Sequence, residues 1–182
     1  MPGSLIKVDE FTVSSAVASV IIGGGSNGSS GLNASIDTSF DVYILRILNF
    51  MPSTDNVSAY MRITKSGTAD TTSNYDYAYK DLKAYTTYAN NTSTNQDKLN
   101  FGNTGTSTNE GVNTTMYLFN FGSSSEYSFG TEETSMLISN QSLRGQQGGF
   151  VHTVASASDG VQFFFSSGNI ASGTFTLYGL KK

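Results

Sequence analysis

The sequence predicts an all-β protein, with residues 1–182 forming a single antiparallel two-sheet β-sandwich, jelly-roll-like, of about eight to ten strands. The hydrophobic segments are short and rich in Val, Ile, Phe and Tyr, the side chains that strands favour. Clusters of Gly, Ser, Thr and Asn separate these segments at the spacing of antiparallel strands. Neither a domain boundary nor an internal repeat is visible, so one sandwich accounts for the whole chain.

The first quarter of the chain predicts two strands followed by a long loop. Residues 5–8 and 11–22 are apolar enough for strands. The second segment carries small side chains on both faces, so it either packs on both sides or lies at a subunit contact. Residues 23–39 open with Gly-Gly-Gly-Ser-Asn-Gly-Ser-Ser-Gly, which predicts a long flexible loop.

The next two strands are the clearest in the chain. Residues 40–51 are almost continuously hydrophobic, which predicts a central strand covered on both faces. Arg46 is the exception, and a charge there requires an acidic partner or a subunit contact. Residues 57–66 alternate between apolar and polar side chains, as a half-buried strand does. The intervening residues 51–56 contain Pro, Ser, Asp and Asn, the composition of a hairpin loop.

The middle of the chain is rich in tyrosine and then in polar residues. Tyr75, Tyr77 and Tyr79 recur with the period of two that indicates a strand, although Tyr75, Tyr79 and Leu82 also fit one short helical stripe. We favour the strand. Residues 90–113 are repetitive in Asn and Thr, which predicts a long loop, with a pair of weak edge strands as the alternative.

The last third returns to clear strand patterns, separated by short polar turns. The predicted strands are residues 115–121, 126–129, 135–139, 150–154, 161–165 and 170–180. Residues 144–149, Arg-Gly-Gln-Gln-Gly-Gly, predict a loop before one of these strands, with Arg144 available for a subunit contact.

The composition excludes several classes of function. The chain has 27 Ser, 21 Thr and 15 Asn but only 13% charged residues and a net charge of −4, so hydroxyls and amides must cover its surface. Ten Lys and Arg residues give no basic patch for nucleic acid. No apolar run is long enough to span a membrane, and no secretory signal opens the chain. The lack of cysteine removes disulfides, thiol catalysis and thiolate metal sites.

Candidate catalytic groups are few. His152 is the only histidine, so any Ser-His-Asp arrangement would have to use it. The segment Gly-Gly-Ser-Asn-Gly at 24–28 matches a nucleophile elbow around Ser26, but no helical pattern follows it as that motif requires. His152 alternates with Phe150 and Val154, as a structural histidine in a strand would. We therefore predict no catalytic residue.

Acidic residues predict neither a glycosidase nor a metal site. Glu132 and Glu133 are adjacent, as are Asp9 and Glu10, and adjacent strand residues point to opposite faces. The chain also lacks the tryptophan that sugar-binding sites commonly use. The loop acids, Asp70 among them, have no EF-hand spacing, so we predict no metal and no cofactor.

The tyrosines are the best candidates for an interaction site, because tyrosine is large, stiff and amphipathic. A cross-strand aromatic ladder that only stabilises the sheet is the alternative. The predicted interface residues are Tyr75, Tyr77, Tyr79, Tyr85, Tyr88 and Arg144.

Several segments resemble small structural proteins of tailed bacteriophages, known from marine phages as virion structural or tail-fibre-like proteins. They are Ser-Leu-Ile-Lys-Val-Asp-Glu-Phe-Thr-Val-Ser-Ser-Ala-Val-Ala-Ser-Val at the start, Phe-Asp-Val-Tyr, Pro-Ser-Thr-Asp-Asn, Met-Arg-Ile-Thr-Lys-Ser-Gly, and the closing Ile-Ala-Ser-Gly-Thr-Phe-Thr-Leu-Tyr-Gly-Leu-Lys-Lys. The resemblance implies a jelly-roll-like sandwich that is made in the host cytoplasm and displayed on the virion. It supplies no site residue.

The resulting expectation is a non-enzymatic virion surface protein that assembles with capsid or tail proteins and forms homo-oligomers. A capsid decoration protein is the leading form, because the chain has no heptads, shaft repeat or anchoring domain. A tail fibre or trimeric fibre tip that binds a host receptor is the alternative. A carbohydrate-binding module for a host glycan is the second alternative, and an enzyme, such as a depolymerase or esterase, is the third.

Overall fold

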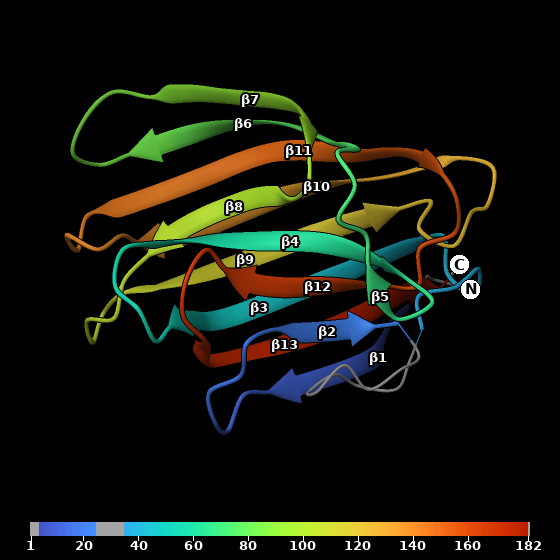
Figure 1. The fold of residues 1–182 in the computed structure, drawn as a ribbon, viewed down its shortest axis with the longest axis horizontal. Coiled ribbons are helices and arrows are strands. Elements are labelled where there is room, and N and C mark those ends of the chain that lie inside the picture. Colours follow the sequence, from blue (N-terminus) through green and yellow to red (C-terminus); the bar gives the residue numbers. More distant parts are fainter. Residues whose placement is uncertain (1–3, 25–34, 182) are drawn as a thin grey trace.

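The computed structural model describes residues 4–24 and 35–181, which form two antiparallel sheets packed face to face (Figure 1). The predicted all-β sandwich is confirmed. Thirteen strands are described, more than the eight to ten expected, because several are short or lie in segments that the sequence marked as loops. Within the described ranges, no helix has the length and apolar character needed to cross a membrane.

The larger sheet has eight strands and the smaller sheet has five. The order in the larger sheet is β1 (Ser4–Thr12), β13 (Ile170–Lys181), β3 (Val42–Pro52), β9 (Gly111–Phe119), β10 (Tyr127–Leu137), β11 (Leu143–Ala155), β6 (Tyr75–Lys83) and β7 (Ala89–Gln96). The smaller sheet contains β2 (Val20–Gly23), β12 (Gly160–Phe165), β4 (Val57–Lys65), β5 (Thr68–Ala69) and β8 (Leu99–Thr104). Both β5 and β8 pair with β4.

Aromatic side chains from both sheets form the centre of the core. Phe50 of the larger sheet stacks on Phe165 of the smaller sheet, with 4.1 Å between ring centroids. Phe101 and Phe175 lie 6.0 and 5.5 Å from Phe50, and all four rings are buried. Ring pairs at these separations add to the stabilisation that apolar burial provides. This cluster holds the two sheets together.

The smaller sheet covers one face of the larger sheet and leaves the other open. In β3 the buried residues alternate with exposed or half-buried ones, and Arg46 is among the exposed residues. The expectation that residues 40–51 would be covered on both faces is therefore wrong. The larger sheet is also the wider one, and β6 and β7 extend beyond the edge that β8 forms (Figure 1).

Residues 90–113 are not a long loop. They contain most of β7, all of β8 and the start of β9. Leu99 and Phe101 of β8 are buried in the core, and β7 is an edge strand, as the alternative expectation held. Threonine is β-branched and favours extended backbone, so the polar Thr-rich composition concealed strands whose side chains face solvent.

Two connections differ from the expectation because the chain crosses between sheets. Residues 11–22 are not one strand, since β1 ends at Thr12 and β2, which begins at Val20, belongs to the smaller sheet. Residues 51–56 do not close a hairpin either. They lead from β3 in the larger sheet to β4 in the smaller one. Local turn chemistry does not distinguish a hairpin from such a crossing.

Two further corrections concern β10 and β11. The predicted strands 126–129 and 135–139 belong to one continuous strand, β10. Residues 144–149 are not a loop but part of β11, paired with β10 on one side and β6 on the other. A Cβ atom at Gly148 would overlap the carbonyl oxygen of Ala78, so glycine lets the strands approach here. The predicted loop at 23–39 and the elbow-like segment around Ser26 lie largely outside the described residues.

We predict that the two faces of the larger sheet respond differently to the same substitution. Phe50→Ala, which empties the core, should lower the free energy of unfolding by about 3–5 kcal/mol. Phe129→Ala, on the open face with the side chain 41% exposed, should cost less than about 1.5 kcal/mol. Urea unfolding followed by circular dichroism measures both. Equal losses would contradict the one-sided burial.

Candidate functional site

The open side of the larger sheet is the candidate functional site. We define the outer face as the side chains of β1, β13, β3, β9, β10, β11 and β6 that point away from the smaller sheet. Several of its large apolar residues are substantially exposed, among them Leu48 at 39%, Tyr117 at 42% and Leu5 at 51%. Others, such as Ile44 and Phe119, are half-buried. An exposed apolar patch of this breadth usually marks a surface that binds another molecule.

Strand register aligns the apolar side chains of the outer face in rows across the strands. The first row consists of Leu5, Leu180, Val42, Phe119, Phe129 and Val151. Phe119 and Phe129 stack within it, with 5.4 Å between their ring centroids. The next row contains Tyr178, Ile44 and Tyr117. Aromatic residues are the side chains most enriched at protein interfaces.

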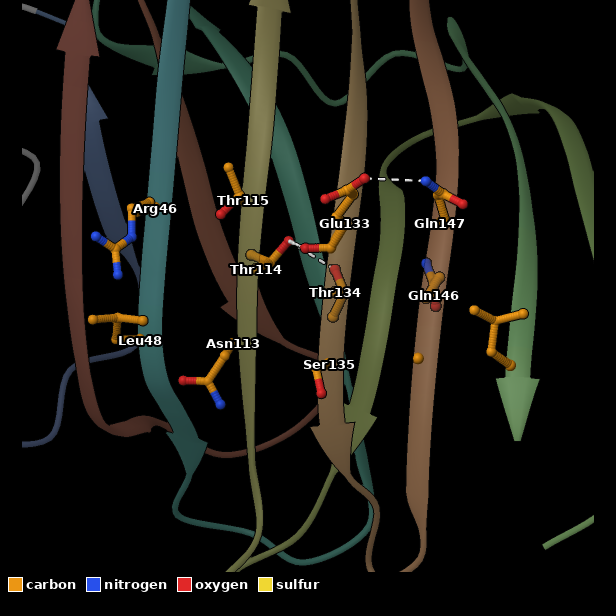
Figure 2. Close-up of a pocket in the computed structure, with 12 residues that line it drawn as sticks. Arg46, Leu48, Asn113, Thr114, Thr115, Glu133, Thr134, Ser135, Gln146 and Gln147 are labelled. Carbon is orange, nitrogen blue, oxygen red and sulfur yellow. Dashed lines mark hydrogen bonds between the residues drawn. The ribbon is translucent and has the colours of Figure 1, made fainter. Parts of the chain in front are cut away.

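A polar row runs beside these apolar rows and carries four charges of alternating sign. The row consists of Glu10, Thr176, Arg46, Thr115, Glu133, Gln147 and Lys80, in the sheet order from β1 to β6. Figure 2 shows its central part, where Arg46, Thr115, Glu133 and Gln147 lie at one level on four successive strands. Charged positions are two strands apart, which is roughly 10 Å.

The charges of this row differ in how they are satisfied. Glu133 accepts a hydrogen bond from the Gln147 amide at 3.1 Å. Glu10 accepts one from Thr176 at 3.2 Å and also pairs with Lys7 of its own strand at 3.3 Å. The ammonium group of Lys80 lies 4.8 Å from the ring centroid of Tyr88. Arg46 makes no ion pair with any residue that the structure describes. Its predicted acidic partner is therefore not among the described residues, and the predicted subunit contact stays a prediction.

The predicted tyrosine interface does not form one surface. Tyr75 is fully buried, so its assignment to an interface is wrong. Tyr77 and Tyr79 are half-buried on the inward side of β6, and their rings stack at 5.6 Å. Both rings belong to one strand, so this contact is not the cross-strand ladder of the alternative. Only Tyr85 and Tyr88, 48% and 68% exposed beside the turn from β6 to β7, are accessible. The odd-numbered positions of β6 point inward, and sequence alone did not reveal which set faced the core.

Arg144, the sixth predicted interface residue, instead forms an ion pair inside its own chain. Its guanidinium lies 2.9 and 2.7 Å from one carboxylate oxygen of Asp81, which is buried. Asn91 donates a hydrogen bond to the other oxygen of Asp81 at 2.9 Å. This cluster ties β11, β6 and β7 together on the inward side, so Arg144 has a structural role here.

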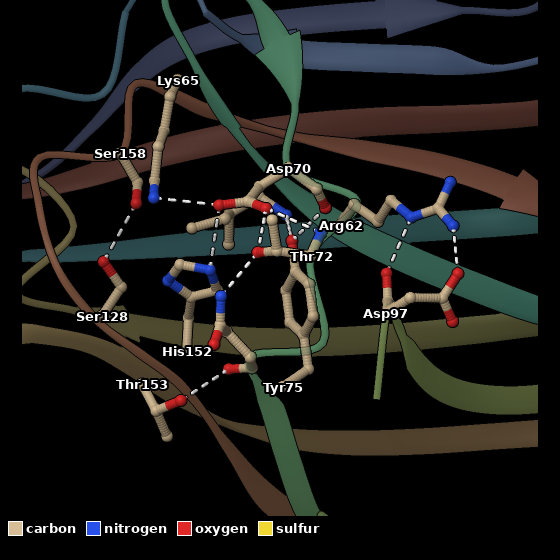
Figure 3. A network of polar contacts seen from close by, with 12 residues as sticks. Arg62, Lys65, Asp70, Thr72, Tyr75, Asp97, Ser128, His152, Thr153 and Ser158 are labelled. Carbon is tan, nitrogen blue, oxygen red and sulfur yellow. Dashed lines mark hydrogen bonds and ion pairs between the residues drawn. The ribbon is translucent and has the colours of Figure 1, made fainter. Parts of the chain in front are cut away.

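His152 belongs to a second polar network, at the junction of the two sheets (Figure 3). Its Nε2 lies 3.2 Å from the carboxylate of Asp70, which also pairs with Lys65 at 2.9 Å. Tyr75 donates a hydrogen bond to the backbone oxygen of Asp70 at 2.8 Å and accepts one from the Ile63 amide at 3.2 Å. The network connects β6 and β11 to β4, which is a structural role.

The pKa shifts of His152 and Asp70 agree with this structural role. Burial, and then the positive charge of Lys65, lowers the pKa of His152 although Asp70 opposes the shift. Burial alone would raise the pKa of Asp70, but hydrogen bonds from Thr72 and the contact with Lys65 lower it overall. The arrangement therefore favours a neutral histidine beside a carboxylate whose charge is already neutralised.

The two adjacent acidic pairs point to opposite faces, as predicted. Glu132 and Asp9 are buried, whereas Glu133 and Glu10 are exposed. Among the described residues, no group of three or more His, Asp or Glu side chains is arranged to hold a metal ion.

Searches of protein-family models, of curated proteins and of solved structures each returned no match for this chain.

Glu132 is a buried acid that gives the fold a pH dependence. Burial raises the pKa of Glu132 to about 7, against hydrogen bonds from Gln146 at 2.5 Å and Thr134 at 3.4 Å that act to lower it. Because the folded-state pKa is raised, the stabilisation is complete below the unfolded value of 4.5 and is lost as the pH rises through about 7.

We predict that Glu132→Gln stabilises the protein at pH 8 by about 1–3 kcal/mol and has little effect at pH 4. The difference in unfolding free energy between variant and wild type, measured by urea unfolding across this range, isolates this group from Asp9, whose pKa burial raises to about 6. Glu133→Gln, one residue away on the outer face, is the matched control and should change stability by less than about 0.5 kcal/mol at either pH. A pH-independent effect of Glu132→Gln would refute the buried-acid interpretation.

Proposed function

We propose that this protein is a non-enzymatic structural component of a bacteriophage virion, displayed on the particle as a capsid decoration protein. The observation that carries the proposal is the outer face, a broad sheet surface with exposed aromatic and aliphatic rows beside a charged row. Such a surface suits a wide contact with neighbouring virion proteins, further copies of this chain included. The resemblance of both ends of the chain to phage structural proteins supplies the setting.

The polar groups of the interior also support a structural role. His152, Asp70 and Lys65 contact one another, and Asp81 pairs with Arg144. These contacts occur where strands or sheets meet, so each group stabilises the scaffold. The outer face carries a hollow of about 380 Å³ between Arg46, Glu133 and Gly145, but the exposed apolar rows extend well beyond it. This breadth favours a docking surface over a substrate pocket, because small-molecule sites bury most of their ligand in a concave cleft.

A decoration protein must bind its particle in a defined stoichiometry. We predict that the purified chain, added to particles that lack it, binds in a fixed ratio to the major shell protein and is distributed over the capsid, as seen by electron microscopy of labelled protein. Label confined to the tail would refute decoration and favour the fibre alternative.

This binding should require the outer face, in contact either with shell proteins or with further copies of the chain. Phe129→Asp places a charge in the exposed apolar row and should reduce the bound fraction at least about tenfold. Tyr85→Ser, at an exposed site beside the β6–β7 turn, is the control and should bind as the wild type does. Equal binding by both variants would show that binding does not need the outer face.

A further inference from the structure

The polar row of the outer face is self-complementary in charge. Its four charged residues follow the order minus, plus, minus, plus from β1 to β6, at Glu10, Arg46, Glu133 and Lys80. Equal numbers of intervening strands separate them. Reversing the order of the strands therefore turns each charge into its opposite.

We propose that two copies of this chain pack outer face against outer face, about a twofold axis that runs along β9. Such a rotation keeps each row at its level and reverses the strand order, so β3 faces β10 of the second copy and β1 faces β6. Arg46 of each copy then meets Glu133 of the other, and Glu10 meets Lys80. The inference rests on the proposed use of the outer face in assembly and names a second copy as the partner that covers this face. The dimer then contacts the particle through its other surfaces, and the loss of particle binding expected for Phe129→Asp follows from loss of the dimer.

Other twofold arrangements are less favourable. An axis that runs along the row keeps the strand order, so Arg46 would meet Arg46 and Glu133 would meet Glu133. An axis along any strand other than β9 leaves at least two of the four charges without an opposite charge. Contacts near the axis tolerate sheet twist best, because neighbouring strands rotate by roughly 20–25°. The pair of Arg46 and Glu133, one strand on either side of β9, is therefore the central contact.

The arrangement also supplies the missing partner of Arg46. That guanidinium is exposed and forms no ion pair with the described residues of its own chain. Arginine is the cation best suited to a planar, bidentate contact with a carboxylate across an interface. In the dimer the contact is made twice, once on each side of the axis, as an isologous interface requires.

Two glycines of β11 support the same arrangement. Gly145 and Gly149 point outward, and β13 of the second copy, with Thr174 and Tyr178, lies opposite them. Within one chain, a Cβ atom at Gly145 would meet its nearest neighbour at an ordinary 3.5 Å, whereas one at Gly149 would lie a tight 3.3 Å from the Gly130 carbonyl oxygen. The inward Gly148 differs, because a Cβ there would overlap Ala78 and Tyr79. The fold of one chain therefore does not require glycine at position 145. In the dimer, the side chain of Thr174 from the second copy would occupy the space above this glycine.

The area of the shared face is adequate for a dimer. The strands from β1 to β6 span roughly 34 Å at the usual strand spacing, and three outward levels span about 20 Å along the strands. Their product is roughly 700 Å² in projection, close to the ~800 Å² that each partner buries in an interface of standard size.

Sedimentation velocity of the full chain between about 1 and 200 μM tests this proposal, since interfaces of this size dissociate in or below that range. The wild type should form dimers. Arg46→Glu and Glu133→Arg should each raise the dimer dissociation constant at least about 100-fold, because each places two like-charge pairs at the interface. Glu126→Arg, exposed in the loop before β10, is the matched control and should dimerise normally.

An equimolar mixture of Arg46→Glu and Glu133→Arg should regain the dimer, because both contacts of the mixed species join opposite charges. Gly145→Val should keep or raise the midpoint of unfolding while weakening the dimer, which separates packing between copies from folding. A wild type that stays monomeric, variants that dimerise normally, or a mixture that stays monomeric would each overturn the proposal. A monomer that still binds particles would overturn this inference alone, and a dimer that binds none would overturn the proposed function alone.

Discussion

One constraint governs this structure: the larger sheet has to satisfy two environments, because the smaller sheet covers only one of its faces. The strands that lie opposite the smaller sheet, such as β3, β9 and β10, therefore alternate between side chains that reach the aromatic core and side chains that remain accessible. The inward set includes Phe50, Phe175 and Met116, all fully or almost fully buried. The outward set includes Tyr117, Phe129 and Leu180, which are apolar and yet more than 40% exposed. An outward set of this kind is the reason for assigning the open face a role in assembly.

The same constraint explains where the polar residues are. On the inward side, where β6 and β7 extend past the smaller sheet, polar groups are buried and pair with one another, as Asp81 does with Arg144. At the junction of the sheets, Lys65, Asp70 and His152 form the corresponding cluster. On the outer face four of the charges lie in one row across the strands, while Lys7 and Asp76 lie at other levels. The low overall charge thus reflects a chain in which most polar positions are hydroxyls and amides on strands, and in which the remaining charges occupy specific places.

The sequence predicted the class of fold because class depends on local patterns. The alternation in residues 57–66 and at Tyr75, Tyr77 and Tyr79 is a property of single strands, and each became a strand. Connections between sheets could not be predicted, because the turn residues that follow β3 are compatible with a hairpin or a crossing. Strands such as β7 and the first half of β11 escaped detection because Asn, Thr, Gln and Gly dominate them.

The candidate site could not be predicted from the sequence either, because it depends on how the strands pair. The polar row joins residues as distant in sequence as Glu10 and Glu133, and only the register of successive strand pairs aligns them. The tyrosines of β6 attracted attention by composition, but one strand alone does not reveal which alternate set faces the core, and Tyr75 proved to be central to it. Arg46 was the useful signal: a charge in a very apolar strand needs either a partner or an exposed face.

The central claim is that the outer face is covered when the protein assembles. Hydroxyl-radical footprinting, compared between dilute protein and the assembled or particle-bound form, tests it most directly. The account predicts that Tyr117 and Phe129 lose most of their reactivity on assembly, while Tyr85, exposed beside the β6–β7 turn, keeps its own. Undiminished reactivity of Tyr117 and Phe129 in the assembled form would contradict the account.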